Sequence, residues 1–348
     1  MRATLPTDAP YDDTVLGSSQ GGASAYGDDD HHGDPQHAVA LVAAMLGGVL
    51  VTGQSRMNGE LSRAIEAPIQ AAVYSFGSGL VLLTVLLVAP RVRAGVGRIR
   101  DALRGGRLRW WQCLGGMGGA LFVAVQTYAV PLVGVAIFTV ATVAGQTGNA
   151  LVVDRFGIGP GGRRPVALSR VLAAGLAIVG VAITVSGSLG EGGLAVLPVV
   201  LAVLVGGGVA LQQGVNARVN RESRHVLSTT AQNFATGTAL LLVIAAVQLV
   251  RGSYSPTDFD GVPWWAWWGG FLGIGFIAIA AWAVQHVGVL VFGLALLTGQ
   301  LGSALAVDLL WPAGGHEVSA RMVLGVVVTF AAAALAGWFA SPRRGVGG

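Results

Sequence analysis

The chain has 348 residues, of which 53% are hydrophobic and only 11% are charged, and its mean hydropathy is +0.67. An average soluble domain carries about 25% charged residues, and a soluble fold needs that charge to keep its surface in water. The composition therefore excludes an ordinary soluble protein and predicts an integral membrane protein.

The basic residues do not indicate a nucleic-acid partner. All 21 are arginines, and the calculated isoelectric point is about 9.8. They lie in short segments between apolar runs rather than along one face, which is typical of membrane orientation. We therefore predict no nucleic-acid partner. The single cysteine, Cys113, excludes an intrachain disulfide framework.

The first 37 residues differ in composition from the rest of the chain. Residues 1–37 hold seven aspartates and three histidines but no basic stretch followed by an apolar one. This pattern is not that of a signal peptide and predicts a disordered acidic tail in the cytoplasm. Because such a tail has no fixed geometry, we predict no metal site from its histidines. A short basic tail, 341–348, ends the chain.

Ten apolar runs fill the region between the tails. Each approaches or exceeds the roughly 20 residues that a helix needs to cross the hydrocarbon of a bilayer, and a helix satisfies its own backbone there. The sequence therefore predicts an all-α polytopic membrane protein with ten transmembrane helices. The predicted spans are 38–58, 69–89, 110–130, 132–153, 168–188, 194–214, 228–250, 264–284, 287–311 and 320–340.

The arginine distribution predicts the orientation. With a cytoplasmic N-terminus, the inner connections contain 17 arginines and the outer ones contain four, a bias that follows the positive-inside rule. We therefore predict a multi-pass protein of the bacterial cytoplasmic (inner) membrane with both termini in the cytoplasm. The densest cluster, Arg91 to Arg109, holds seven arginines and one acid, Asp101. It fits an orienting loop or a contact with anionic lipids.

An internal repeat relates the two halves, 38–188 and 194–340. Gly48, Gln54, Asn58, Phe76 and Gly79 recur 158 residues later, and Trp111, Gly119, Phe122, Gly134, Gly145, Gln146 and Asp154 recur 154 residues later. Each repeat contains five predicted helices, so the second must enter the membrane upside down relative to the first. Such 5+5 inverted-topology repeats are typical of secondary transporters, whose substrate site lies where the halves meet.

Four segments also resemble a known family, the YdcZ-like branch of the drug/metabolite transporter superfamily. They are GGVLVTGQSRMN (47–58), AAVYSFGSG (71–79), WWQCLGGMGGALFVAVQTYAVPLVG (110–134) and AGQTGNALVVD (144–154). Members of this branch are small five-helix bacterial membrane proteins, and two such units are fused here over about 38–340. The resemblance implies an inner-membrane carrier of small molecules, more often an exporter. The second copy departs from the pattern at Gln213-Gly214-Val215-Asn216.

Polar residues within the predicted helices are the candidates for a substrate path, because such residues are costly in a membrane and usually face the bundle interior. We predict that these amides and hydroxyls line a central cavity. The alternative is that they join helices by hydrogen bonds of about 1 kcal/mol or less each. The candidates are Gln54, Asn58, Thr139, Thr142, Gln146, Asn149, Gln212, Asn216, Gln300 and Ser303.

Two aspartates suggest gates. Asp154 ends the fourth predicted helix at the inner face and Asp308 ends the ninth at the outer face, each on the same side as two arginines of the opposite half. The hypothesis is that each aspartate pairs across the halves and closes one gate in turn. The alternative is a solvated helix-end charge or a local pair, such as Asp154 with Arg155. The predicted gating residues are Asp154, Asp308, Arg56, Arg63, Arg218 and Arg221.

The sequence thus favours a secondary transporter of a small polar or amphipathic metabolite that works by alternating access. No acidic residue lies in the middle of a predicted helix, which argues against a deep proton-binding carboxylate, and proton, sodium or no coupling ion all stay open. The absence of a phosphate-binding loop excludes ATP-driven transport by this chain. We predict no catalytic residues, no metal and no cofactor. The predicted partners are a small-molecule substrate and membrane lipids, and a homodimer stays open. A membrane enzyme acting on lipid-linked substrates and a non-transporting scaffold are the alternatives.

Overall fold

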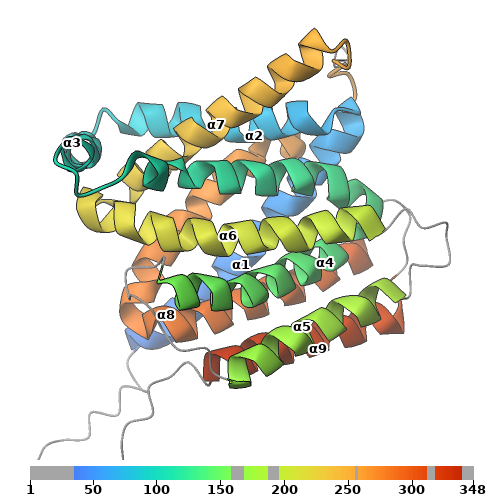
Figure 1. Cartoon of the computed structure of the whole chain (residues 1–348). Coiled ribbons are helices and arrows are strands. Elements are labelled where there is room, and N and C mark those ends of the chain that lie inside the picture. The colour runs from blue at the N-terminus through green and yellow to red at the C-terminus, as the bar shows by residue number, and fades with distance from the viewer. Residues whose placement is uncertain (1–34, 158–167, 187–195, 255–257, 312–317, 339–348) are drawn as a thin grey trace, which may run out of the picture.

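The computed structural model describes residues 35–157, 168–186, 196–254, 258–311 and 318–338 (Figure 1). These residues form a bundle of helices, and the all-α prediction is confirmed. Most of both predicted tails lies outside the described residues. The helices are α1 (Pro35–Ile65), α2 (Pro68–Leu86), α3 (Pro90–Arg104), α4 (Gly115–Phe156), α5 (Leu168–Ser186), α6 (Val196–Ser223), α7 (Val226–Val250), α8 (Gly269–Leu310) and α9 (Ala320–Trp338), with short 3-10 turns at Trp110–Leu114 and Trp264–Trp268.

Each of the ten predicted spans overlaps an apolar helical segment of the described residues, which confirms the polytopic membrane fold. Six described helical segments are both long and apolar enough to cross a bilayer, and three shorter apolar segments supply the remaining predicted spans. The long segments are Gln36–Ile65, Pro68–Leu86, Trp110–Val153, Val196–Ser223, Val226–Val250 and Val291–Leu310, and the shorter ones are Val171–Ser186, Trp264–Ala280 and Ala320–Leu335.

α4 contains the third and fourth predicted spans, separated by a sharp break. The backbone of Gly134 has φ 83° and ψ 170°, a conformation that glycine adopts readily and other residues do not. The sequence marked this boundary at Pro131, and the structure places it three residues later. The two segments of α4 are visible as separate green helices in Figure 1.

α1 runs in the same direction as the first segment of α4, which belongs to its own half. Gln126 forms hydrogen bonds with both Ser55 and Asn58, and further along both helices Gly59 packs against Val130. The residue numbers of the contacts increase together in the two helices, so the helices are parallel.

α1 runs opposite to the first segment of α8, which lies within Trp264–Ala280 and is the repeat counterpart of the first segment of α4. Asn58 packs against Gly269, whereas Gln54, one turn earlier in α1, packs against Gly273, one turn later in α8. Equivalent helices of the two halves thus run in opposite directions, and the halves are inverted relative to each other.

The second segment of α8 runs in the same direction as α1. Gly48 packs against the backbone of Leu296, and Thr52 receives a hydrogen bond from the Ser303 hydroxyl, with 2.9 Å between the two oxygens. Since the first segment of α8 runs the other way, the chain reverses direction within α8. The eighth and ninth predicted spans are therefore two separate crossings.

Hydrogen bonds at the two ends of the bundle join segments that the predicted topology places on the same side of the membrane. Arg107 Nε donates to Glu222 Oε2 over 3.0 Å between two inner connections, and Arg321 Nη1 donates to the Ser186 carbonyl over 3.1 Å at the outer end. The contacts agree with the predicted order of crossings. Which end faces the cytoplasm stays a prediction from the arginine distribution.

Three features differ from the sequence expectation, and one of them is that α6 ends at Ser223, nine residues beyond the predicted end at 214. Residues 90–104, expected as a loop, form α3, whose buried residues Val92, Gly95, Ile99 and Ala102 follow a helical spacing. α1 also continues seven residues beyond its predicted end. It therefore contains Glu60, which is only 5% exposed, so an acidic residue does lie buried inside a helix.

The halves meet at glycines that let helix backbones approach closely. A Cβ atom on Gly145 would overlap the carbonyl oxygen of Val203, and one on its repeat counterpart Gly299 would overlap that of Met45. Small residues at such crossings are typical of packed membrane helices.

Gly299→Ala is expected to lower the free energy of unfolding by about 3 kcal/mol, because the added methyl group must push two backbones apart. Gly302→Ala is the matched control, since a Cβ there meets no heavy atom within 4 Å and alanine favours a helix over glycine. Thermal unfolding of the two purified variants in detergent distinguishes them. Equal melting temperatures would contradict the packing described here.

Candidate functional site

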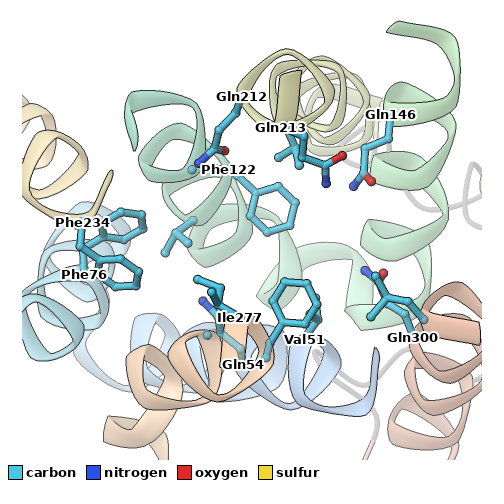
Figure 2. A pocket seen from close by; sticks show the side chains of 16 residues that line it. Val51, Gln54, Phe76, Phe122, Gln146, Gln212, Gln213, Phe234, Ile277 and Gln300 are labelled. Carbon is cyan, nitrogen blue, oxygen red and sulfur yellow. The ribbon is translucent and has the colours of Figure 1, made fainter. Parts of the chain in front are cut away.

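A cavity of about 200 Å³ lies between the two halves. Its walls come from α1, α2, α4, α6, α7 and α8, and Figure 2 shows the polar side chains that point into it. The lining residues are Val51, Gln54, Phe76, Gly119, Phe122, Val123, Gln146, Val209, Gln212, Gln213, Phe234, Gly273, Phe276, Ile277, Leu296 and Gln300.

The cavity reproduces the internal repeat almost completely. Seven pairs of lining residues are related by the repeat offsets, namely Val51 with Val209, Gln54 with Gln212, Phe76 with Phe234, Gly119 with Gly273, Phe122 with Phe276, Val123 with Ile277, and Gln146 with Gln300. The two exceptions are Gln213, which stands where the first half has Ser55, and Leu296, which stands where it has Thr142. Both halves therefore contribute to the site about equally.

Four of the predicted site residues, all glutamines, line the cavity. Gln146 and Gln300 extend from the second segments of α4 and α8 at one side, and Gln54 and Gln212 come from α1 and α6 (Figure 2). Each amide offers both hydrogen-bond donors and an acceptor and carries no charge. Gln213 adds a fifth amide that the repeat pattern did not reveal.

Phenylalanines form an apolar wall of the same cavity. The rings of Phe76 and Phe234 stack at a centroid distance of 4.9 Å and an interplanar angle of 28°. Each ring also fills the space beside a glycine of the other half, because a Cβ on Gly79 would overlap Phe234 and one on Gly237 would overlap Phe76. The glycines therefore allow the two rings to meet between the halves. Their repeat was visible in the sequence, but their stacking was not.

The predicted asparagines lie outside the cavity lining. Asn58 Nδ2 donates to Gln126 Oε1 over 2.8 Å, and Asn149 Nδ2 donates to the Gly207 carbonyl over 2.6 Å. Asn216 packs its amide oxygen against Gly115 of the other half. The alternative explanation, hydrogen bonds between helices, agrees with the contacts of Asn58 and Asn149, whereas the contact of Asn216 is one of packing.

The predicted hydroxyl residues also lie in helix contacts rather than on the cavity wall. The Thr142 hydroxyl donates to the Thr139 carbonyl over 2.9 Å within α4, and both residues are at most 1% exposed. The Ser303 hydroxyl donates to Thr52 of α1. Neither these residues nor the three asparagines belong to the described cavity lining, so their role in substrate binding stays a prediction.

Arg56 and Arg63, predicted to belong to the outer gate, pair with Glu60, which the sequence analysis did not identify. Arg56 Nη1 lies 2.8 Å from Glu60 Oε2, and Arg63 pairs with the other oxygen of the same carboxylate. Arg56 also lies over the ring of Trp265 in the opposite half, 5.8 Å from its centroid, a cation–π contact. Glu60 was missed because the first helix was expected to end at residue 58.

Asp308 contacts the opposite half through backbone amides. Its carboxylate accepts hydrogen bonds from the backbone nitrogens of Val135 at 3.0 Å and Ala136 at 2.7 Å, and the residue is only 3% exposed. These amides begin the second segment of α4 immediately after the break at Gly134, so Asp308 caps a helix N-terminus, where a negative charge is stabilised. A cross-half contact of Asp308 was expected, but with arginines.

At the other end of the bundle, Arg218 also reaches across the halves. Its Nη2 atom donates to the carbonyl of Gly157, just after α4, over 2.8 Å. Arg221 is exposed. The side chain of Asp154 lies outside the described residues, so its predicted pairing stays a prediction.

Comparison with known proteins places the chain in a family. No curated protein matches it significantly. The family described as "Putative inner membrane exporter, YdcZ" matches the chain twice, at residues 39–183 and 197–335. Each match covers one of the two five-helix repeats. The chain therefore belongs to the YdcZ family of the drug/metabolite transporter superfamily and carries two copies of its unit, inverted relative to each other, in one inner-membrane protein.

Proposed function

We propose that the protein is a secondary transporter that exports a small, uncharged, amphipathic molecule through the cavity between its halves. The observation that supports this most is the cavity itself, in which two inverted repeats supply equivalent glutamines and phenylalanines. Substrate sites between inverted repeats are typical of secondary transporters. A membrane enzyme would need a nucleophile or an acid–base group at its site, and the described lining has only apolar and amide side chains.

The lining chemistry narrows the substrate class. Five amides provide hydrogen bonds, and the stacked phenylalanines provide an apolar surface. No ionisable side chain belongs to the described lining, and a charged substrate would lose its hydration without a counter-charge. The expected substrate therefore carries hydrogen-bonding groups on one side and an apolar or aromatic group on the other.

The gates of this transporter are proposed at the two ends of the interface between the halves. At the outer end, Asp308 holds the N-terminus of the second segment of α4. Separation of these groups would open the cavity outward. By the repeat, Asp154 would take the equivalent role at the inner end. In this proposal both chain termini are cytoplasmic.

A ligand screen on the purified protein tests the substrate class. Uncharged amphipathic compounds are expected to raise its melting temperature, whereas matched organic cations and anions are not. The stabilisation is expected to disappear in a Gln54→Leu, Gln212→Leu double variant and to persist in Gln248→Leu, whose residue lies outside the cavity lining. Stabilisation mainly by cations or anions would overturn the proposed class, and stabilisation that survives in the double variant would overturn the proposed site.

A further inference from the structure

α3 lies across one end of the helix bundle. Figure 1 shows it end-on, whereas α2, α4 and α6 extend across the view. These three elements contain candidate membrane spans. α3 therefore runs along the plane of the membrane surface rather than through the bilayer. The predicted topology places this end in the cytoplasm.

Specific contacts fix α3 to the turn between α6 and α7. The Ser228 hydroxyl donates to the Val92 carbonyl over 2.7 Å, and the backbone of α3 approaches this serine closely at Gly95. Arg98 Nε donates to the Ser223 carbonyl over 2.7 Å. The apolar face of α3 is buried against the protein, so the opposite face points away from the bundle.

That outward face carries a stripe of arginines, defined as Arg93, Arg100 and Arg104. All three are exposed, and their spacing of seven and four residues places them on one side of a helix. Val96 lies three or four residues from two of them and is 37% exposed, so it borders the stripe on the helix surface. An arginine-rich polar face is typical of helices that lie at the interface between headgroups and acyl chains.

Two exposed tryptophans follow α3 in the sequence. Trp110 is 72% exposed and Trp111 is 41% exposed, and both follow α3 after a short turn. Tryptophan favours the membrane–water interface. Arginine side chains at this depth can reach lipid phosphates.

We propose that the arginine stripe of α3 binds the phosphate groups of anionic phospholipids in the leaflet at this end of the protein. The charge is complementary, and a lipid can fill the adjoining apolar surface with its acyl chains, which a free phosphate or a nucleic acid cannot do. This proposal concerns a surface separate from the cavity and does not depend on transport.

Lipid binding to the full-length protein in detergent tests the proposal. Phosphatidylglycerol and phosphatidylcholine are titrated separately, and bound lipids are counted by native mass spectrometry. We expect phosphatidylglycerol to bind preferentially. We expect Arg93→Gln, Arg100→Gln, Arg104→Gln together to weaken that binding by about 100-fold at low ionic strength, since each arginine at a membrane surface contributes about a five-fold effect.

Two control variants separate the site from overall charge. The triple variant Arg155→Gln, Arg251→Gln, Arg321→Gln removes the same charge from exposed positions elsewhere and is expected to bind phosphatidylglycerol normally. Arg93→Lys, Arg100→Lys, Arg104→Lys keeps the charge and is expected to retain most of the binding. Unchanged binding in the glutamine triple variant of α3 would overturn the proposal. Full displacement of the lipid by millimolar inorganic phosphate, or tighter binding of an RNA oligonucleotide at the stripe, would also overturn it.

Discussion

Replacing Gln146 and Gln300 together with leucine is expected to lower export by about 30- to 100-fold, because each lost hydrogen bond to a buried substrate costs about 1–1.5 kcal/mol. The two amides occupy equivalent positions in the inverted halves and lie at one side of the cavity (Figure 2). Leucine keeps a similar volume, so the fold is expected to persist. The measurement is uptake into inside-out membrane vesicles of the compound that stabilises the protein most in the screen.

Gln248→Leu provides the matched control for this double variant. It makes the same chemical change in α7 at a position outside the cavity lining, and its transport rate is expected to equal that of the parent protein. If the double variant and the control transport equally well, the two cavity glutamines do not bind the substrate. Loss of transport in both variants would point to damage from the substitution rather than to the site.

The second large effect is expected at Asp308. Asp308→Asn keeps the shape of the side chain but removes its charge, so the two hydrogen bonds from the N-terminus of the second segment of α4 weaken by about 2–3 kcal/mol. The outward-open state should then become more populated by roughly 30- to 100-fold. The measurement is the rate at which a membrane-impermeant maleimide labels a cysteine introduced into the cavity, applied from the outer side.

Asp258→Asn is the control for Asp308→Asn. Asp258 is an exposed residue whose carboxylate accepts a hydrogen bond from the nearby Asp260 amide, so its substitution should leave labelling unchanged. If Asp308→Asn also leaves both labelling and transport unchanged, Asp308 does not hold the outer gate closed.

Much of the fold could be predicted because membrane helices are recognised by the length and hydropathy of their apolar runs. The ten spans and their inversion followed from apolar runs and from an odd number of helices per repeat. The position of the break in α4 could not be predicted in this way. The sequence predicts the boundary at Pro131 because proline interrupts helices, whereas the helical backbone breaks at Gly134. α3 was not predicted because its many arginines give it a low mean hydropathy. Its four buried residues lie on only one side of the helix.

The site was predicted in part, and the limits have physical causes. Gln146 and Gln300 share a fixed repeat offset and were predicted to line a central cavity, and both belong to the described cavity lining. Thr142 lies on the same predicted helical face as Gln146, but α6 packs against it at Gly206, so it does not reach the cavity. The contact of Asp308 with the opposite half could not be found from side-chain chemistry, since Asp308 accepts hydrogen bonds there from two backbone amides.

Alternating access through the cavity is tested most directly by labelling from each side of the membrane. Cys113 is the only cysteine, so a Cys113→Ala background with Gln213→Cys places a single thiol in the cavity. The account predicts that Asp308→Asn raises labelling of this thiol from the outer side and that Asp154→Asn raises it from the cytoplasmic side. If both substitutions increase labelling from the same side, the two aspartates do not guard opposite ends of one path.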